Sequence, residues 1–154
     1  MSIKLLFSLS ASILLSNISL AIHPASSPAT PCEQICGKWK STEKNLVIQV
    51  SMVNEKFKAE IVWFDPGEGK PMETYTDLHN PDESLRGRKV LGINVLRDLS
   101  YQSTSRSWED GIVYDCSSGR EWNASVYIDK SGLLKVKGYW HFKFIGRTLT
   151  FKRV

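Results

Sequence analysis

The sequence predicts an all-β domain, a small antiparallel meander that closes into a β-barrel of about eight strands. Short segments alternate apolar and polar residues with a period of two, and Gly-containing turns separate them at even spacing. No long segment repeats its apolar residues at the helical period of 3.6. A closed barrel is favoured over an open sheet because closure leaves no strand edge exposed.

The expected strands follow one another from the region of Gly37 to the C-terminus. Residues 46–52 and 57–63 each alternate apolar side chains on one face, and the short link between them is typical of a hairpin. The next strand is expected over Lys89 to Arg97, with Gly92 marking a bulge or a bend. The alternation then continues over 112–114, 122–128, 134–140 and 149–153, across turns at 117–119 and 129–132.

Residues 77 to 88 are polar, rich in turn-forming residues and not patterned as a strand. Asn80 is expected to cap a short helix that begins just after it and stops at Gly87 in the left-handed conformation. Arg86 and Arg88 are candidate binding residues, because guanidinium groups match carboxylates and phosphates. The alternative is that both arginines pair with nearby carboxylates and fasten this segment to the barrel.

The N-terminus has the organisation of a removed export signal. Lys4 supplies a basic start, Leu5 to Leu20 is apolar and rich in Ser, and Ala21 ends a small-residue cleavage motif. A retained anchor is the alternative, but the Ser residues leave fewer than the ~18 consecutive apolar residues that a spanning helix needs. We expect a periplasmic or secreted protein with a signal peptide over 1–21, a flexible linker over 22–35 and one barrel domain over 36–154.

Charge and motifs exclude several function classes. The chain carries 20 Lys and Arg against 16 Asp and Glu, a net charge of +4 that is small and interspersed, so we expect no nucleic-acid partner. A Ser nucleophile elbow, a phosphate-binding loop and a zinc-binding helix are absent from the sequence. His79 and His141 do not belong to a motif that supplies a nucleophile and a base together. We therefore expect no enzyme, no cofactor, no catalytic residue and no metal site.

Three cysteines are present, and export to an oxidising space would allow one disulfide. Cys36 with Cys116 is the candidate pair, which would pin the N-terminal segment to the barrel. Cys32 with Cys116 and Cys32 with Cys36 remain alternatives. The C-x3-C spacing, with no second Cys or His pair, does not indicate a zinc or redox site.

A barrel of about eight strands is wide enough to be filled by its own side chains or to hold one small ligand. A ligand pocket combines apolar walls with a few polar anchors. The candidate ligand-binding residues are Trp63, Arg86, Arg88, Tyr114, Trp122 and Tyr139. The alternative is that these aromatic residues form the core itself.

Nearly the whole mature domain, from Trp39 to Val154, resembles a bacterial family of exported proteins catalogued as domain of unknown function number 2147. The matching residues are Gly37-Lys-Trp39, Ile61-Val-Trp63, Asp77, Asn80-Pro81, Leu85-Arg86, Arg88, Leu91-Gly92, Trp108, Gly111-Ile-Val-Tyr-Asp115, Gly119, Leu134, Val136, Gly138-Tyr139, Gly146-Arg-Thr148 and Arg153. The resemblance implies a lipocalin-type barrel. Family members commonly carry a paired cysteine motif before Ile61, which this chain lacks, and often have Pro at Cys116 and Trp at Phe151, so their disulfide pattern is not implied here.

The two ends of the domain carry a second resemblance. A Gly-x-Trp on the first strand with an Arg on the last strand is similar to the closing signature of lipocalin-like barrels, and here these residues are Gly37, Trp39 and Arg153. The resemblance implies that the Arg153 cation lies over the Trp39 indole and closes one end of the barrel against water.

Three function classes follow from these expectations. The first is an envelope protein that binds a small apolar or anionic amphipathic ligand through Arg86 or Arg88. The second is an envelope module with a filled core that contacts a protein partner. The third, an integral outer-membrane barrel, is disfavoured because its strands need about nine to eleven residues and the alternating runs here are mostly shorter.

Overall fold

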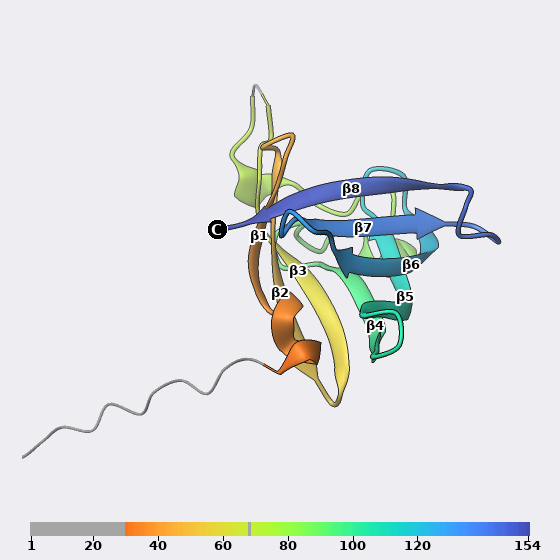
Figure 1. Cartoon of the computed structure of the whole chain (residues 1–154). Helices are drawn as coiled ribbons and strands as arrows, with labels where there is room; N and C mark the ends of the chain where they lie inside the picture. The colour runs from red at the N-terminus through yellow and green to blue at the C-terminus, as the bar shows by residue number, and fades with distance from the viewer. Residues whose placement is uncertain (1–29, 68) are drawn as a thin grey trace, which may run out of the picture.

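The computed structural model describes residues 30–67 and 69–154, so the predicted signal peptide over 1–21 and most of the predicted linker lie outside the described residues. Within these residues, eight strands form a closed antiparallel barrel in which every strand pairs with its neighbours in sequence and β1 pairs with β8 (Figure 1). The strands are β1 Gly37–Ser41, β2 Leu46–Val53, β3 Lys56–Phe64, β4 Asn94–Gln102, β5 Ser107–Asp115, β6 Arg120–Ile128, β7 Leu134–Tyr139 and β8 Gly146–Arg153. The predicted fold class is confirmed.

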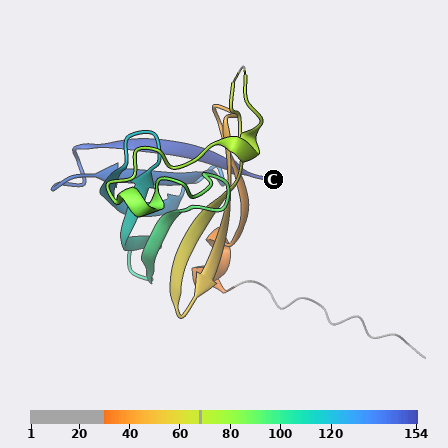
Figure 2. The same cartoon turned by 180° about the vertical axis from the view of Figure 1, so that it is seen from behind.

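Connections alternate between the two ends of an up-and-down barrel. The end that we call the η1 end carries the 3-10 helix η1, Pro31–Ile35, and the C-terminus of β8. The opposite end, the crossover end, carries the long connection from β3 to β4 over residues 65–93, with the 3-10 helices η2, Met72–Thr74, and η3, Glu83–Leu85. Figure 2 shows this crossover segment in light green, away from η1.

The interior of the barrel is packed at its η1 end. Large buried side chains, each at most 2 % exposed, come from strand positions near this end and include Trp39, Phe57, Trp108, Leu134 and Phe151. Phe57 and Trp108 meet edge to face with ring centroids 6.2 Å apart. The interior of an eight-strand barrel is just wide enough for side chains to fill it, and these buried side chains fill it at the η1 end.

Two indole groups tie η1 to the barrel. Trp39 Nε1 donates to the carbonyl of Ile35 at 2.7 Å, and Trp108 Nε1 donates to the carbonyl of Cys32 at 2.9 Å. Arg153 then covers Trp39, with its guanidinium carbon 4.2 Å from the ring centroid. Its Nη1 donates to the carbonyl of Cys36 at 2.8 Å and its Nη2 to that of Gln34. These contacts close the η1 end.

The predicted linker over 22–35 extends too far, because its last five residues form η1. Thr30 and Glu33 form a capping box in which the backbone N–H of Thr30 donates to Glu33 Oε2 at 3.1 Å, and Pro31 occupies the first helical position. Burial of Ile35 then anchors this short helix in the core.

The crossover segment also differs from its prediction. The helix is shorter than expected, and Asp82 caps it by accepting from Ser84 N at 2.9 Å, while Asn80 is buried elsewhere. Gly87 does not adopt the left-handed conformation. The strand expected from Lys89 begins only at Asn94, because Gly92, at φ +88°, turns the chain just before it.

Replacing Arg153 by Ala is expected to lower the free energy of unfolding by about 2 kcal/mol, since the cation–π contact and two hydrogen bonds to carbonyls are lost. Chemical denaturation checks this value, with the exposed neighbour Lys152→Ala as the control. Ligand binding at the crossover end should be unchanged. A variant as stable as the native chain would contradict a closing role for Arg153.

Candidate functional site

A buried carboxylate lies at the centre of the crossover end. Asp77 is 0 % exposed, and Tyr114 Oη donates to its Oδ1 at 2.7 Å. Asn80 Nδ2 donates to Oδ2 at 2.7 Å, and Arg88 donates to the same oxygen through Nε at 2.9 Å and Nη2 at 2.7 Å. We call these four residues the Asp77 cluster. The hydrogen bonds and the ion pair within the cluster compensate the negative charge of the buried Asp77 carboxylate.

The cluster holds its groups in fixed protonation states. Burial raises the pKa of Asp77, but the hydrogen bonds from Tyr114, Asn80 and Arg88 outweigh it, and the pKa lies below the ordinary value of 3.8. Burial, followed by the bond to Asp77, raises the pKa of Tyr114 to about 12. At neutral pH Asp77 is therefore ionised and Tyr114 is protonated. In these states the cluster forms a charge-compensated hydrogen-bond network that can position the segments it joins.

Backbone contacts show what the cluster positions. Asp77 N donates to the carbonyl of Arg88 at 2.9 Å, and Arg86 Nε donates to the carbonyl of Asn80 at 2.9 Å. Gly119, in the turn between β5 and β6, packs directly under the carbonyl of His79. The crossover segment is thereby fastened to β5 and to the β5–β6 turn.

A pocket of about 450 Å³, which we call the crossover groove, opens beside the cluster. Its charged lining consists of Arg88, Lys89, Arg97 and Glu121, and its apolar lining includes Leu91, Ile93 and Tyr114. Arg97 Nη2 donates to Glu121 Oε2 at 3.0 Å, whereas Lys89 has no ion pair among the described residues. Positive charge thus exceeds negative charge in the groove.

Arg88 joins the cluster to the groove. Its Nε and Nη2 bind Asp77, its guanidinium carbon lies 5.5 Å from the centroid of the Tyr114 ring, and its side chain is still 39 % exposed. Within the described residues of the chain, no acceptor binds its Nη1. A guanidinium group held on one side by a carboxylate presents its remaining N–H groups in a fixed direction.

A second pocket of about 310 Å³ lies nearer the β7–β8 loop. Trp122, Trp140, His141 and Ile112 contribute to its lining. The two indole rings meet edge to face with centroids 5.6 Å apart.

The structure separates most of the candidate ligand-binding residues. Arg88 and Tyr114 lie together in the crossover groove, and Trp122 lies in the second pocket. Trp63 lies half-exposed beneath the Lys40 ammonium, 5.1 Å from it. Tyr139 and Arg86 lie apart from both sets: Tyr139 is buried near Lys143, and Arg86 bonds the crossover backbone and Glu83.

Sequence reasoning missed Lys89 and Arg97 as groove residues. Both fall in the segment that the sequence predicts as a strand, where alternating charges are ordinarily solvated. The chain turns at Gly92, and both residues line the same pocket; the glycine, where a bulge or bend was already expected, was the available sequence signal.

The candidate disulfide between Cys36 and Cys116 does not fit this fold. Cys36 lies at the η1 end, where its carbonyl binds Arg153, whereas Cys116 follows β5 at the crossover end. Nine residues of β5 span about 30 Å, far more than the ~7 Å between Cα atoms that a disulfide tolerates. All three thiols are free.

Burial, followed by the charge of Asp77, raises the pKa of Cys116 to about 11, so this thiol is protonated at neutral pH.

No group of three or more His, Cys, Asp or Glu side chains among the described residues is arranged to hold a metal ion. Within the same residues, no helix is long and apolar enough to cross a membrane.

Replacing Asp77 by Asn is expected to lower the free energy of unfolding by about 2 kcal/mol at neutral pH, because Arg88 loses its counter-charge. The lowered pKa of Asp77 means that its stabilisation is complete above about pH 4 and is lost as the pH falls through the folded value. Denaturation between about pH 7 and pH 2 should therefore show the two proteins converging in acid. The exposed Glu73→Gln is the control, and a difference that is constant with pH would argue against a charged Asp77.

Two glycines test whether the crossover is fastened to the β5–β6 turn. A Cβ on Gly119 would lie 1.8 Å from the carbonyl oxygen of His79, whereas one on Gly132 meets nothing within 4 Å. Both have positive φ, at +68° and +77°, so both Ala variants bear the same backbone cost. Gly119→Ala should be less stable than Gly132→Ala by about 2 kcal/mol in chemical denaturation. Equal stabilities would show that the contact with His79 is unimportant.

Comparisons with known proteins agree with the observed barrel. A solved structure described as "Protein HP1028 from the human pathogen Helicobacter pylori belongs to the lipocalin family" is similar to this chain, with 26% sequence identity and a TM-score of 0.66. The similarity covers 77% of this chain and 82% of that one. No protein with a curated description matches the chain.

The family of the chain follows from its sequence match. Residues 37–153, nearly the whole barrel, match the family described as "Uncharacterized protein conserved in bacteria (DUF2147)". The match begins in β1 and ends in β8, so it takes in both the crossover groove and the closing contact at the η1 end. The protein therefore belongs to this bacterial family and has a lipocalin-like barrel.

Proposed function

We propose that this protein binds a small amphipathic ligand with an anionic head group in the crossover groove, and that it acts by binding and not by catalysis. The observation that carries the proposal is Arg88, whose guanidinium is held by Asp77 on one side and borders the groove on the other. A preorganised cation of this kind binds a carboxylate or phosphate with little loss of side-chain entropy.

The lining of the groove supports an amphipathic ligand over a purely polar one. Arg88, Lys89 and Arg97 outnumber the single lining carboxylate, Glu121, which Arg97 already binds. Leu91 and Ile93 supply apolar surface at the same place. A pocket with apolar walls and a few charged anchors is the usual form of a small-ligand site.

The position of the groove agrees with the packing of the barrel. The η1 half of the interior is filled by Trp39, Phe57 and Trp108, so a ligand has no place there. The crossover end has the two pockets described above. The ligand would therefore lie against the crossover segment and not deep in the barrel.

The cellular location belongs to the same proposal. The basic, apolar and small-residue pattern over residues 1–21 supports export to the periplasm or beyond the cell. Native mass spectrometry of the chain recovered from its own host would report the N-terminus and any bound molecule together. A start after Ala21 supports export, and an adduct that is lost on denaturation identifies the class of ligand.

Decyl phosphate should raise the melting temperature, whereas decyl glucoside, with the same chain and no charge, should not. Lys89→Glu is expected to weaken decyl phosphate binding at least tenfold, because a groove cation becomes an anion. Lys38→Glu, an exposed residue of β1 at the η1 end, makes the same charge change and serves as the matched control. Equal binding of both detergents, or equal effects of both substitutions, would argue against an anionic ligand in this groove.

A further inference from the structure

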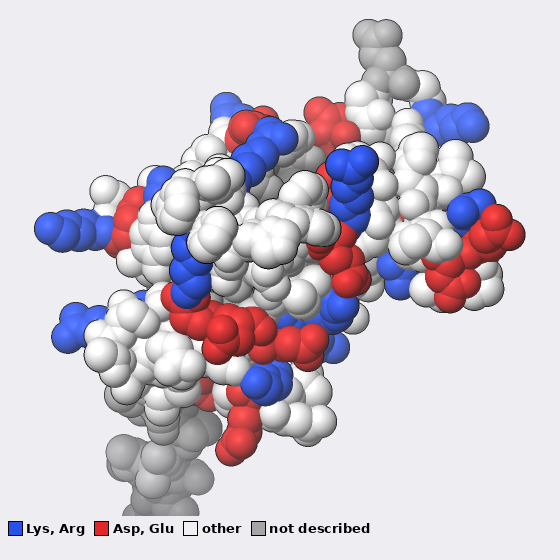
Figure 3. Space-filling view, turned by 90° about the vertical axis from the view of Figure 1, so that its right-hand side faces the viewer, with Lys and Arg blue, Asp and Glu red and all other residues white. Residues whose placement is uncertain are grey.

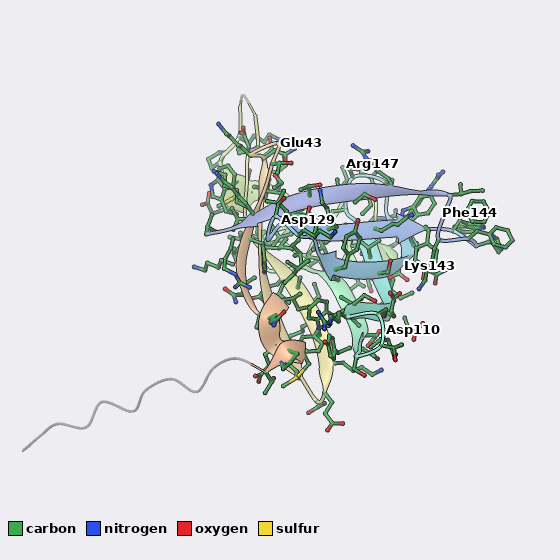
Figure 4. The ribbon with its side chains drawn as sticks, in the orientation of Figure 1. Glu43, Asp110, Asp129, Lys143, Phe144 and Arg147 are labelled. Carbon is green, nitrogen blue, oxygen red and sulfur yellow. The ribbon has the colours of Figure 1, made fainter. Side chains whose placement is uncertain are left out.

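The loop between β7 and β8 exposes a set of large apolar side chains. Trp140, Phe142, Phe144 and Ile145 are each 60–79 % exposed, and we call them the aromatic tip. Phe142 and Phe144 stack with ring centroids 5.4 Å apart. Figure 4 shows Phe144 at the outermost point of the loop, beyond the body of the barrel. Apolar surface concentrated on a projection is costly in water and is typical of a contact site.

The hairpin that carries the tip is strongly basic. Residues 134–153 contain six Lys or Arg and no Asp or Glu, although the whole chain has a net charge of only +4. Lys143 binds Glu109 of β5 at 2.5 Å, but Lys137 and Arg147 have no ion pair within the described residues. These two cations flank the tip and are available to an external anion.

Charge is unevenly distributed around the tip. Figure 4 shows Arg147 on the β8 side of the loop and Asp110 on the opposite side. Figure 3 views the molecule from the direction in which the loop projects, with uncharged surface at the centre and a band of Asp and Glu along one side of it. The protein would therefore approach a flat anionic surface with the β8 side of the loop turned towards that surface.

Shape and composition decide what kind of partner fits. The apolar side chains of a projecting loop are buried only if the partner surrounds them. The interfacial region of a lipid bilayer can do this without a preformed pocket. Aromatic rings and basic side chains together are characteristic of that interface. Single-stranded nucleic acid fits less well, because Phe142 and Phe144 stack on each other and the aliphatic Ile145 has no ring to offer a base.

We propose that the β7–β8 loop docks on an anionic lipid surface, with the aromatic tip inserted among the headgroups and Arg147 and Lys137 against the lipid phosphates. The insertion is peripheral, and the barrel stays outside the bilayer. Docking is independent of the ligand proposed for the crossover groove, since it uses none of the lining of that groove.

Vesicle flotation tests the proposal with phosphatidylcholine alone and with about 30 mol% phosphatidylglycerol added. The native chain, as recovered from cells that express all 154 residues, should float with the anionic vesicles and not with the neutral ones. Raising the salt from about 0.1 M to about 0.5 M should weaken the binding, since screening shortens the reach of Arg147 and Lys137.

Two variants assign the binding to the loop. Each is a double variant: one combines Phe142→Ser with Phe144→Ser, and the other combines Arg147→Gln with Lys137→Gln. Each should reduce the partition into anionic vesicles at least tenfold. Leu78→Ser is the matched control for the apolar change, because Leu78 is 65 % exposed on the crossover segment. All variants share one N-terminus, so differences among them report the loop and not residues 1–29.

Other outcomes would overturn the proposal. Failure to float with either vesicle, equal flotation with both, or flotation that survives the double Phe substitution each contradicts docking by the tip. Concentration-dependent dimers in lipid-free buffer that disappear in the same Phe variant would assign the tip to a second copy of the chain. Tight binding of single-stranded RNA in place of vesicles would assign the basic hairpin to nucleic acid.

Discussion

A carboxylate with no access to water must be compensated by the protein around it, and the arrangement of the crossover end follows from how Asp77 meets this requirement. Its two oxygens accept from Tyr114 of β5 and from Asn80 and Arg88 of the crossover segment, so one charge joins segments that are far apart in the sequence. Among its described residues the connection over 65–93 has little regular structure of its own, and the cluster links its central residues to one another and to β5 in the observed conformation. The crossover groove depends on that conformation, because Arg88 belongs to both.

The two ends of the barrel are built on different physical principles. Aromatic packing fills the η1 end, where η1 lies over Trp39 and Trp108 and the Arg153 cation covers the indole of Trp39. Polar contacts organise the crossover end, which carries the groove, the second pocket and the projecting β7–β8 loop. The largest buried aromatic side chains and the two pockets therefore lie towards opposite ends of the barrel.

Periodicity was enough to predict the barrel because each strand has one face in a common core. Leu134 and Val136 are buried while Lys135 and Lys137 between them are more exposed, as a period of two requires. The strand prediction was wrong at Lys89, where alternation continues into a turn. The linker prediction came from composition and the predicted cleavage site, and it extended over Pro31–Ile35, where Thr30, Pro31 and Glu33 form the start of a helix. The candidate cysteine pair does not fit either, because Cys36 precedes β1 and Cys116 follows β5, which places them at opposite ends of the barrel and beyond the reach of a disulfide.

The sequence by itself determined the fold class, the family and the closing pair of Trp39 and Arg153 at the η1 end, since these depend on local alternation and on short motifs such as Gly37-Lys-Trp39. Only the tertiary structure decided that Asp77 is buried, that Arg88 is held by it, and that Lys89 and Arg97 face one groove. It also decided that Trp140, Phe142 and Phe144 project outward and do not line the core. The physical reason is that exposure and charge compensation depend on contacts between distant segments, which no local pattern contains.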